Sequence, residues 1–178
     1  MNDDVFWTLI NDSSKKSNHD QSRQYEILKT SLMNLNPREI LAFERILRKK
    51  IIECDNYKIL AASKIINDYV TDDSYLYFRA WLIAKGRIVF ENALEDPDSL
   101  AIHITKNEIA DFEDLLFIAT EAYNDHPNNK EDNVDNLGSL VSDKLDYDFN
   151  PPPTKGEDWT EEDLPKICPK LCKKFDWK

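Results

Sequence analysis

The chain has 178 residues and a formal net charge of −11, and it contains only three cysteines, three histidines and three glycines. A chain of this length suits one domain with its own core, so neither a disulfide nor a metal is needed to hold it together. The start MNDDVF is acidic where a signal peptide is basic, and no apolar run approaches the ~20 residues that span a bilayer. These features predict a cytoplasmic protein without a membrane span.

The negative charge lies in the second half of the chain. Residues 1–90 hold 14 Lys/Arg and 12 Asp/Glu, a net charge of +2, whereas residues 91–178 hold 9 and 22, a net charge of −13. Because an acidic surface repels phosphate, nucleic-acid binding is disfavoured. The excess serves either solubility or the docking of a basic protein partner.

Few glycines and little strand-like alternation predict an all-α fold. A first helix is expected to start in NDDVFWTLIND, where Asp3 or Asp4 can accept hydrogen bonds from free amides. A second is expected over residues 21–33, with apolar residues three and four positions apart. Each helix would turn one apolar face to a core.

The stretch NPREILAFERILRKKIIE has the clearest helix start in the chain. Asn36 can act as the cap, Pro37 suits the first helical position, and Glu39 completes a capping box. The apolar face of this helix consists of Ile40, Phe43, Leu47 and Ile51. The cations are expected on a solvated face near the helix C-terminus, with a binding patch as the alternative: Arg45, Arg48, Lys49 and Lys50.

A fourth helix is expected over about residues 56–68, followed by TDDSYLYFRAWLIAKGRIVF, which is apolar on every side along its first half. Such a helix belongs in the centre of a bundle. We therefore predict a compact multi-helix bundle around a central apolar helix at about residues 74–94. Gly86 would be a contact point or a kink in that helix, and close approach of a ligand is the alternative.

Three further helices are indicated after the central one. Asp96 can cap a short helix that begins at Pro97. NEIADFEDLLFIATEAYNDH predicts one amphipathic helix, and NVDNLGSLVSDKLDY a weaker one. The inward residues of the amphipathic helix would be Phe112, Leu115, Leu116, Ala119 and Tyr123.

The composition changes at NPPPTKGEDW. We expect a helical domain over residues 1–149 and a Pro-rich linker with a short helical extension over residues 150–178. Thr160 and Asp163 form a T-x-x-D cap, and Trp159 occupies the position of a hydrophobic staple. These features favour an extension packed back on the domain, and disorder is the alternative.

Arg79 stands in the middle of the apolar stretch. An unpaired buried guanidinium is costly, so this side chain must reach water or a carboxylate. Asp72, Asp73 or a glutamate of another helix could form an ion pair with it and set the helix register. The alternative is an anion-binding cleft that would contain Asp72, Asp73, Arg79, Trp81 and Arg87.

No catalytic motif is present in the sequence. The histidines lie far apart and are expected on the surface: His19, His103 and His126. The cysteines are expected to be reduced thiols, with a zinc site at the C-x3-C pair as a minor alternative: Cys54, Cys168 and Cys172. We therefore expect no catalytic residue, no cofactor and no metal.

Several blocks resemble, in the same order, those of the bacterial domain-of-unknown-function family 4240. They are DDVFWTLI, NPREILAFERIL, TDDSYLYFRAWLIAKGRIVFENALEDPDSLA, FEDLLFIATEAY and GEDWTEEDLPKICPKLCKKF. The aspartate pair followed by YFR and WLI is the most specific part of the resemblance. It implies a fold and a cellular context more than a reaction, and it fits an accessory or interaction role.

The leading expectation is a non-catalytic cytoplasmic binding or regulatory protein, such as an immunity-like protein, that presents an acidic face to a basic protein. The acidic residues of that face would be Asp111, Glu113, Asp114, Glu157, Asp158, Glu161 and Glu162, with Trp159 as an aromatic anchor. The alternative is a small-molecule or anion sensor, or an enzyme, with a pocket around Asp72, Asp73, Arg79 and Trp81.

Overall fold

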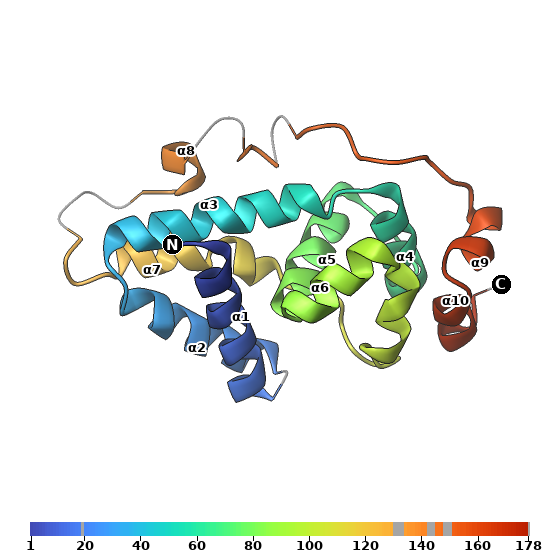
Figure 1. Ribbon diagram of the computed structural model, residues 1–178, viewed down its shortest axis with the longest axis horizontal. Coiled ribbons are helices and arrows are strands. Elements are labelled where there is room, and N and C mark those ends of the chain that lie inside the picture. The colour runs from blue at the N-terminus through green and yellow to red at the C-terminus, as the bar shows by residue number, and fades with distance from the viewer. Residues whose placement is uncertain (19, 130–133, 142–144, 148–150, 178) are drawn as a thin grey trace.

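The structure is a computed structural model that describes residues 1–18, 20–129, 134–141, 145–147 and 151–177 (Figure 1). Its regular secondary structure is helical. Across these ranges there is no β-strand, and one isolated bridge joins Asn56 to Lys155. The all-α prediction is confirmed. The helices are α1 Asp3–Ser17, α2 Gln21–Met33, α3 Pro37–Glu53, α4 Tyr57–Asn67, α5 Asp72–Ala84, α6 Arg87–Glu95, η1 Pro97–Ile102, η2 Glu113–Leu116, α7 Ile118–Asn124, α8 Gly138–Val141, η4 Glu161–Asp163, α9 Leu164–Ile167 and α10 Pro169–Phe175.

Helix α3 lies along the long axis of the molecule in the half away from α9 and α10, and it contacts α1, α5 and α7 (Figure 1). It begins as the sequence predicts, because Asn36 Oδ1 accepts a hydrogen bond from Glu39 N at 3.1 Å and Glu39 Oε2 accepts one from Asn36 N at 3.2 Å. Its predicted apolar face is entirely buried: Ile40, Phe43, Leu47 and Ile51. A local capping motif and one apolar stripe therefore determine this helix.

The N-terminal caps of α1 and α5 are Asn2 and Thr71, and each precedes a pair of aspartates. Asn2 Oδ1, not Asp3 or Asp4, accepts the hydrogen bond from Val5 N at the start of α1. At α5 the cap is Thr71. The nearby aspartates of both helices occupy first-turn positions, where negative charge is favourable to the helix dipole.

The single central helix predicted over residues 74–94 is wrong in its extent, because it is divided into α5 and α6. Gly86 lies between them with φ of +99°, and a Cβ atom there would be 2.5 Å from Asn11 Oδ1. The same Asn11 oxygen accepts a hydrogen bond from Arg87 N at 3.1 Å. A side chain of α1 thus holds the break, and α5 alone is the central helix, with Phe78 and Trp81 fully buried.

The one helix predicted over NEIADFEDLLFIATEAYNDH is also interrupted. Backbone carbonyls of its first part bond to side chains from elsewhere: Ile109 O accepts from Gln21 Nε2 at 3.2 Å, and Ala110 O accepts from Asn67 Nδ2 at 3.3 Å. Tertiary hydrogen bonds therefore replace helical ones before η2 and α7 begin. The residues predicted to face inward are nonetheless buried: Phe112, Leu115, Leu116, Ala119 and Tyr123.

The cationic face predicted on α3 is divided between solvent and interior. Arg45 and Lys49 are exposed, as expected. Arg48 is 5% exposed, which corrects the prediction of a solvated face. Its Nε donates to Glu44 Oε1 at 2.6 Å, and its Nη2 donates to Asn136 Oδ1 at 3.0 Å. Arg48 thereby attaches the chain beyond α7 to α3.

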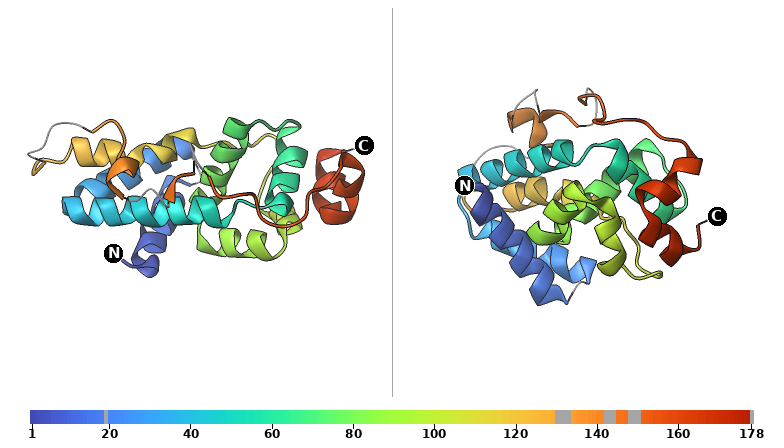
Figure 2. Two further views of the ribbon diagram at one scale, coloured as in Figure 1. Left: turned by 90° about the horizontal axis from the view of Figure 1, so that it is seen from above. Right: turned by 45° about the vertical axis from the view of Figure 1, so that its right-hand side comes forward.

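Helices α9 and α10 pack against α4, and α10 also contacts η1 (Figure 2). Thr160 N and Oγ1 donate to Asp163 Oδ2 at 3.2 and 3.0 Å, as the T-x-x-D motif predicts. The indole of Trp159 donates to Tyr57 O at 2.5 Å, and Leu164 is buried. The predicted boundary at residues 149–150 lies outside the described residues and stays a prediction.

Candidate functional site

Arg79 reaches a carboxylate, but from a different element than predicted. Its side chain is 6% exposed, and its Nη1 atom lies 3.2 Å from Asp55 Oδ2, in the turn between α3 and α4. The same nitrogen donates to Ile51 O at 3.2 Å, and the guanidinium carbon lies 4.6 Å from the centre of the Tyr75 ring. The predicted ion pair is therefore present, with Asp55 in place of Asp72, Asp73 or a glutamate.

Tyr75 fixes the turn that carries Asp55. Its hydroxyl accepts a hydrogen bond from Asn56 N at 3.1 Å and lies 3.0 Å from Asn56 O and 3.3 Å from Cys54 O, to which it can donate. Burial raises the pKa of the Tyr75 hydroxyl, and burial likewise raises the pKa of the Cys54 thiol to about 12. The groups around Arg79 are thus enclosed and neutral apart from the ion pair itself.

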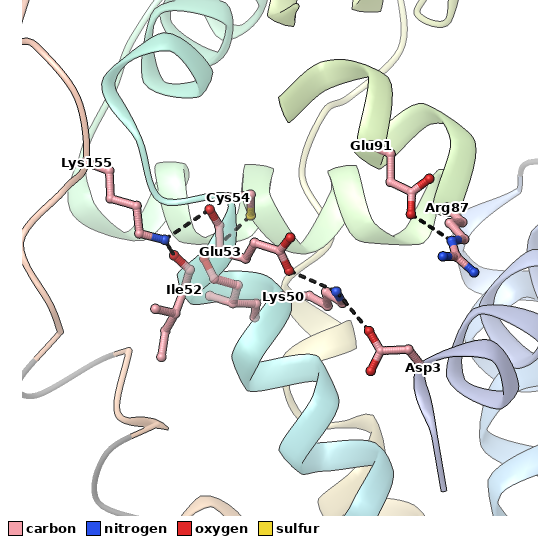
Figure 3. A network of polar contacts seen from close by, with 9 residues as sticks. Asp3, Lys50, Ile52, Glu53, Cys54, Arg87, Glu91 and Lys155 are labelled. Atoms are coloured by element: carbon pink, nitrogen blue, oxygen red, sulfur yellow. Dashed lines mark hydrogen bonds and ion pairs between the residues drawn. The ribbon is translucent and has the colours of Figure 1, made fainter. Parts of the chain in front are cut away.

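The other residues of the predicted anion cleft are not gathered around Arg79. Asp72 and Asp73 are exposed in the first turn of α5. Arg87 lies on α6, where it forms ion pairs with Asp4 at 2.8 Å and Glu91 at 2.7 Å; Figure 3 shows the second pair. These side chains therefore do not form one pocket with Arg79 in the described part of the chain. Binding of a small molecule elsewhere stays a prediction.

A small recess lies beside Trp81, on the α2 side of α5. Its interior has room for about one water molecule. Lys85 Nζ and Trp81 Nε1 both donate to Glu108 Oε1, at 2.6 and 3.2 Å, and Gln24 Nε2 donates to Ala84 O at 2.9 Å. Since these polar groups already pair with one another, the recess presents no open set of ligand-binding atoms.

Four carboxylates gather where η2 packs against α5, and we call them the η2 acidic surface: Asp73, Asp111, Glu113 and Asp114. Tyr77 Oη donates to Glu113 Oε1 at 3.0 Å. This hydrogen bond, then burial, and then the negative charges of Glu113, Asp73 and Asp111 raise the pKa of Tyr77 to about 12. Burial, followed by the charges of Glu113 and Asp114, raises the pKa of Asp111. Asp73, Asp111 and Glu113 thus all act on Tyr77, and Glu113 and Asp114 act on Asp111.

The η2 acidic surface has no neutralising partner among the residues that the structure describes. None of its four carboxylates forms an ion pair there. In contrast, the neighbouring Glu121 and Asp125 share Lys29, with both Nζ to oxygen distances at 2.9 Å. We therefore call the four carboxylates uncompensated, meaning that no described Lys or Arg lies at ion-pair distance from them.

Phe117 adds an exposed aromatic side chain beside these carboxylates, and the sequence interpretation missed it. It is 46% exposed, and its backbone N donates to Asp114 O at 3.1 Å. A signal was available in the sequence FEDLLF, because Phe117 falls outside the pattern of the inward residues Leu115 and Leu116. Asp73 was assigned to the predicted anion cleft, but in the structure it acts on Tyr77 together with Glu113 and Asp111.

The predicted acidic face is divided into two acidic sets, and the second set, residues 157–162, lies beside α4, away from η2. Glu157, Asp158 and Glu162 are exposed, whereas Glu161 pairs with Lys64 at 3.2 Å. Trp159 is half-buried and bonded to Tyr57 O, as described above. The two predicted acidic sets are therefore attached to different parts of the fold, and the one at η2 is the less neutralised.

The described parts of the chain hold no group of three or more His, Cys, Asp or Glu side chains that could bind a metal ion. Nor do they contain a helix that is long and apolar enough to cross a membrane. No curated protein and no solved structure matches the chain. One family does match, over residues 1–125, and its description is protein of unknown function (DUF4240). Because this match covers more than half of the 178 residues, the chain belongs to the DUF4240 family.

Proposed function

We propose that this protein is a non-catalytic, cytoplasmic binding or regulatory protein whose η2 acidic surface docks a basic protein partner. The observation that carries the proposal is the uncompensated group of Asp73, Asp111, Glu113 and Asp114. Uncompensated carboxylates attract Lys and Arg side chains of a partner and speed encounter over about one Debye length, ~8 Å at physiological ionic strength.

Phe117 gives the surface an apolar contact in addition to its charge. Interfaces commonly combine an aromatic anchor with a surrounding polar rim, and the anchor contributes much of the affinity. At 46% exposure the Phe117 ring can lose further accessible surface on binding. We therefore expect a partner that places cationic residues around an apolar residue or depression.

A charge-reversal variant tests the proposal. Asp73, Glu113 and Asp114 are changed to Lys, while the half-buried Asp111 is left intact because it accepts a hydrogen bond from Glu113 N at 3.3 Å. The wild-type chain and the variant are used to capture proteins from the native host, and captured proteins are quantified by mass spectrometry at low and high salt. We expect that a true partner is captured by the wild-type chain at low salt, and that much less of it is captured by the variant or at high salt.

The matched control carries the same change in charge at the other acidic set. It replaces Glu157, Asp158 and Glu162 with Lys, at exposed positions that form no ion pair within the described residues. This control is expected to capture the partner as the wild type does. If the partner stays bound to the η2 variant, or is lost only from the control, the assignment to η2 is wrong.

A further inference from the structure

The segment Lys155–Trp177, which we call the strap, packs on α4 and η1, and we call the surface that it covers there the groove. Leu164, Cys168 and Leu171 of the strap are each 0% exposed. Helix α9 contacts α4, and α10 contacts both α4 and η1 (Figures 1 and 2). The strap thus buries one apolar side against elements that are distant in the sequence.

Polar contacts surround this apolar centre. Lys64 of α4 pairs with Glu161 at 3.2 Å, and its Nζ atom lies 5.4 Å from the centre of the Trp177 ring. Lys174 Nζ donates to Ala101 O at the end of η1, at 2.6 Å. An apolar centre with a polar rim is the usual composition of an interface between separate partners.

Asp98 of η1 is a carboxylate placed to receive the start of a helix. It is 4% exposed, and its oxygens accept hydrogen bonds from Lys170 N at 3.1 Å and Leu171 N at 2.8 Å. These are amides of the first turn of α10, which no carbonyl of the helix itself can satisfy. A carboxylate at this position also suits the helix dipole. Asp98 therefore adds a charged contact with the start of α10 to the apolar contacts of the groove.

Lys155 holds the other end of the strap at the turn between α3 and α4. Its Nζ atom donates to Ile52 O at 2.8 Å and Glu53 O at 3.2 Å, the free carbonyls at the end of α3 (Figure 3). Its backbone N donates to Asp55 O at 3.2 Å, and its O accepts from Tyr57 N at 2.9 Å. The strap is thus attached at this turn and at η1, with the apolar contacts between.

We propose that the strap is a removable ligand of this groove, carried on the same chain, and that the vacated groove accepts a short amphipathic helix of the same design. Along the chain, α4 and η1, which form the groove, end by Ile102, well before the strap begins at Lys155. Its own short helices contact one another, so it can leave as one unit. Local opening of such a unit is easier than global unfolding, and the tether favours its return.

The three cysteines provide an internal test. Burial raises the pKa values of Cys168 in the strap and Cys54 in the main core to about 12, so neither thiol reacts while it is covered. The full-length protein is treated with an alkylating reagent under native conditions, and each cysteine is followed by mass spectrometry. We expect Cys168 and Cys172 to react together, at least about tenfold faster than Cys54, while the amides of α5 stay protected from hydrogen exchange.

Asp98→Asn keeps the size of the anchoring side chain and removes its charge. It should accelerate alkylation of Cys168 and Cys172 without changing Cys54. Glu95→Gln, at an exposed position nearby, is the matched control and should leave all three rates unchanged. A common rate for all three thiols in the wild type would mean that the strap leaves only when the whole protein unfolds, and the proposal would be overturned.

A second measurement tests whether the groove can be occupied from outside. A fluorescent synthetic peptide of residues 155–177 is added to the full-length protein under reducing conditions, and its fluorescence anisotropy is recorded. Saturable binding that a scrambled peptide of equal composition does not show supports the proposal. The peptide is titrated up to ~1 mM, because a tether holds the strap at an effective concentration of that order. Absence of saturable binding over this range overturns the proposal.

Discussion

Arg79 and Asp55 join the central helix to the turn between α3 and α4 through a buried ion pair, with Nη1 and Oδ2 separated by 3.2 Å. Both side chains are largely enclosed, at 6% and 11% exposure. Lys155 of the strap bonds to the backbone of the same Asp55 at 3.2 Å. Three segments that are distant in the sequence, α5, the α3–α4 turn and the strap, therefore meet at one aspartate.

The first prediction concerns this ion pair. Arg79→Met should lower the free energy of unfolding by ~3–5 kcal/mol, because it leaves the buried carboxylate of Asp55 without its cation. Urea denaturation measures the change. Arg87→Met is the matched control and should have little effect, since the ion pairs of Arg87 are exposed to solvent.

The pairing can be separated from the packing of Arg79 with a double-mutant cycle. Asp55→Asn and Arg79→Met together should destabilise less than the sum of the two single changes, because no charge is then left buried. Strictly additive effects would show that the two side chains do not stabilise each other and would contradict the structural role assigned to Arg79.

A second prediction concerns the break between α5 and α6. Gly86→Ala should destabilise the protein by ~1–3 kcal/mol, because φ of +99° suits glycine and because the new Cβ atom would lie 2.5 Å from Asn11 Oδ1. Thermal unfolding gives the difference. Gly156→Ala is an informative comparison, since that residue has φ of +90° but no atom within 4 Å of the added carbon.

The comparison of the two glycines separates backbone strain from the contact with Asn11. If Gly86→Ala costs no more than Gly156→Ala, the close approach of Asn11 contributes nothing. If it costs more, the additional replacement Asn11→Ala should recover part of the loss.

Glu44 leads to a prediction about pH. It is 1% exposed, and burial raises its pKa although Arg48 opposes this effect. A carboxyl group with a raised pKa binds its proton more tightly in the folded protein than in the unfolded chain. Its contribution to stability is therefore complete below the unfolded pKa, near 4.5, and is lost as the pH rises through the folded pKa.

Glu44→Gln should abolish this decrease in stability with rising pH, because the amide does not titrate but can still accept a hydrogen bond from Arg48. Urea denaturation of both proteins between pH of about 4 and about 7 measures it. Glu26→Gln, at an exposed position on α2, should retain the wild-type profile. A variant at Glu44 with an unchanged profile would show that this carboxyl group does not titrate in the window.

The fourth prediction concerns Trp81, which is 1% exposed and donates from Nε1 to Glu108 Oε1 at 3.2 Å. Trp81→Ala should cost ~3–5 kcal/mol, since it leaves a large cavity in the centre of the fold. Trp81→Phe keeps much of the ring and should cost less. Equal stability of the alanine variant and the wild type, by urea denaturation, would rule out α5 as the centre of the core.

Local sequence determined several elements without any tertiary information. Asn36, Pro37 and Glu39 marked the start of α3, and the spacing of apolar residues identified its buried face. The burial of Phe112 and Tyr123 was also predicted from the spacing of apolar residues, although the helix predicted to contain both is reduced to α7. Capping motifs and apolar periodicity act over a few residues and can be read directly.

The candidate site was predicted in part. Asp111, Glu113 and Asp114 were identified from their sequence, because a run of carboxylates is visible there. That Asp73 belongs with them, and that Phe117 is exposed beside them, depended on the packing of η2 against α5. Which acidic residues stay unpaired also depended on the tertiary structure. Lys64 pairs with Glu161, whereas no described cation pairs with the η2 acidic surface.

By itself, the sequence determined that the protein is helical, where α3 begins, which residues are apolar enough for the core and which half is acidic. Tertiary structure decided the break at Gly86, the interruption before η2, the burial of Arg48 and the choice of Asp55 as the partner of Arg79. The physical reason is the range of the interactions. Asn11, Gln21 and Asn67 satisfy backbone groups far along the chain, and no local pattern records which distant side chain will supply such a hydrogen bond.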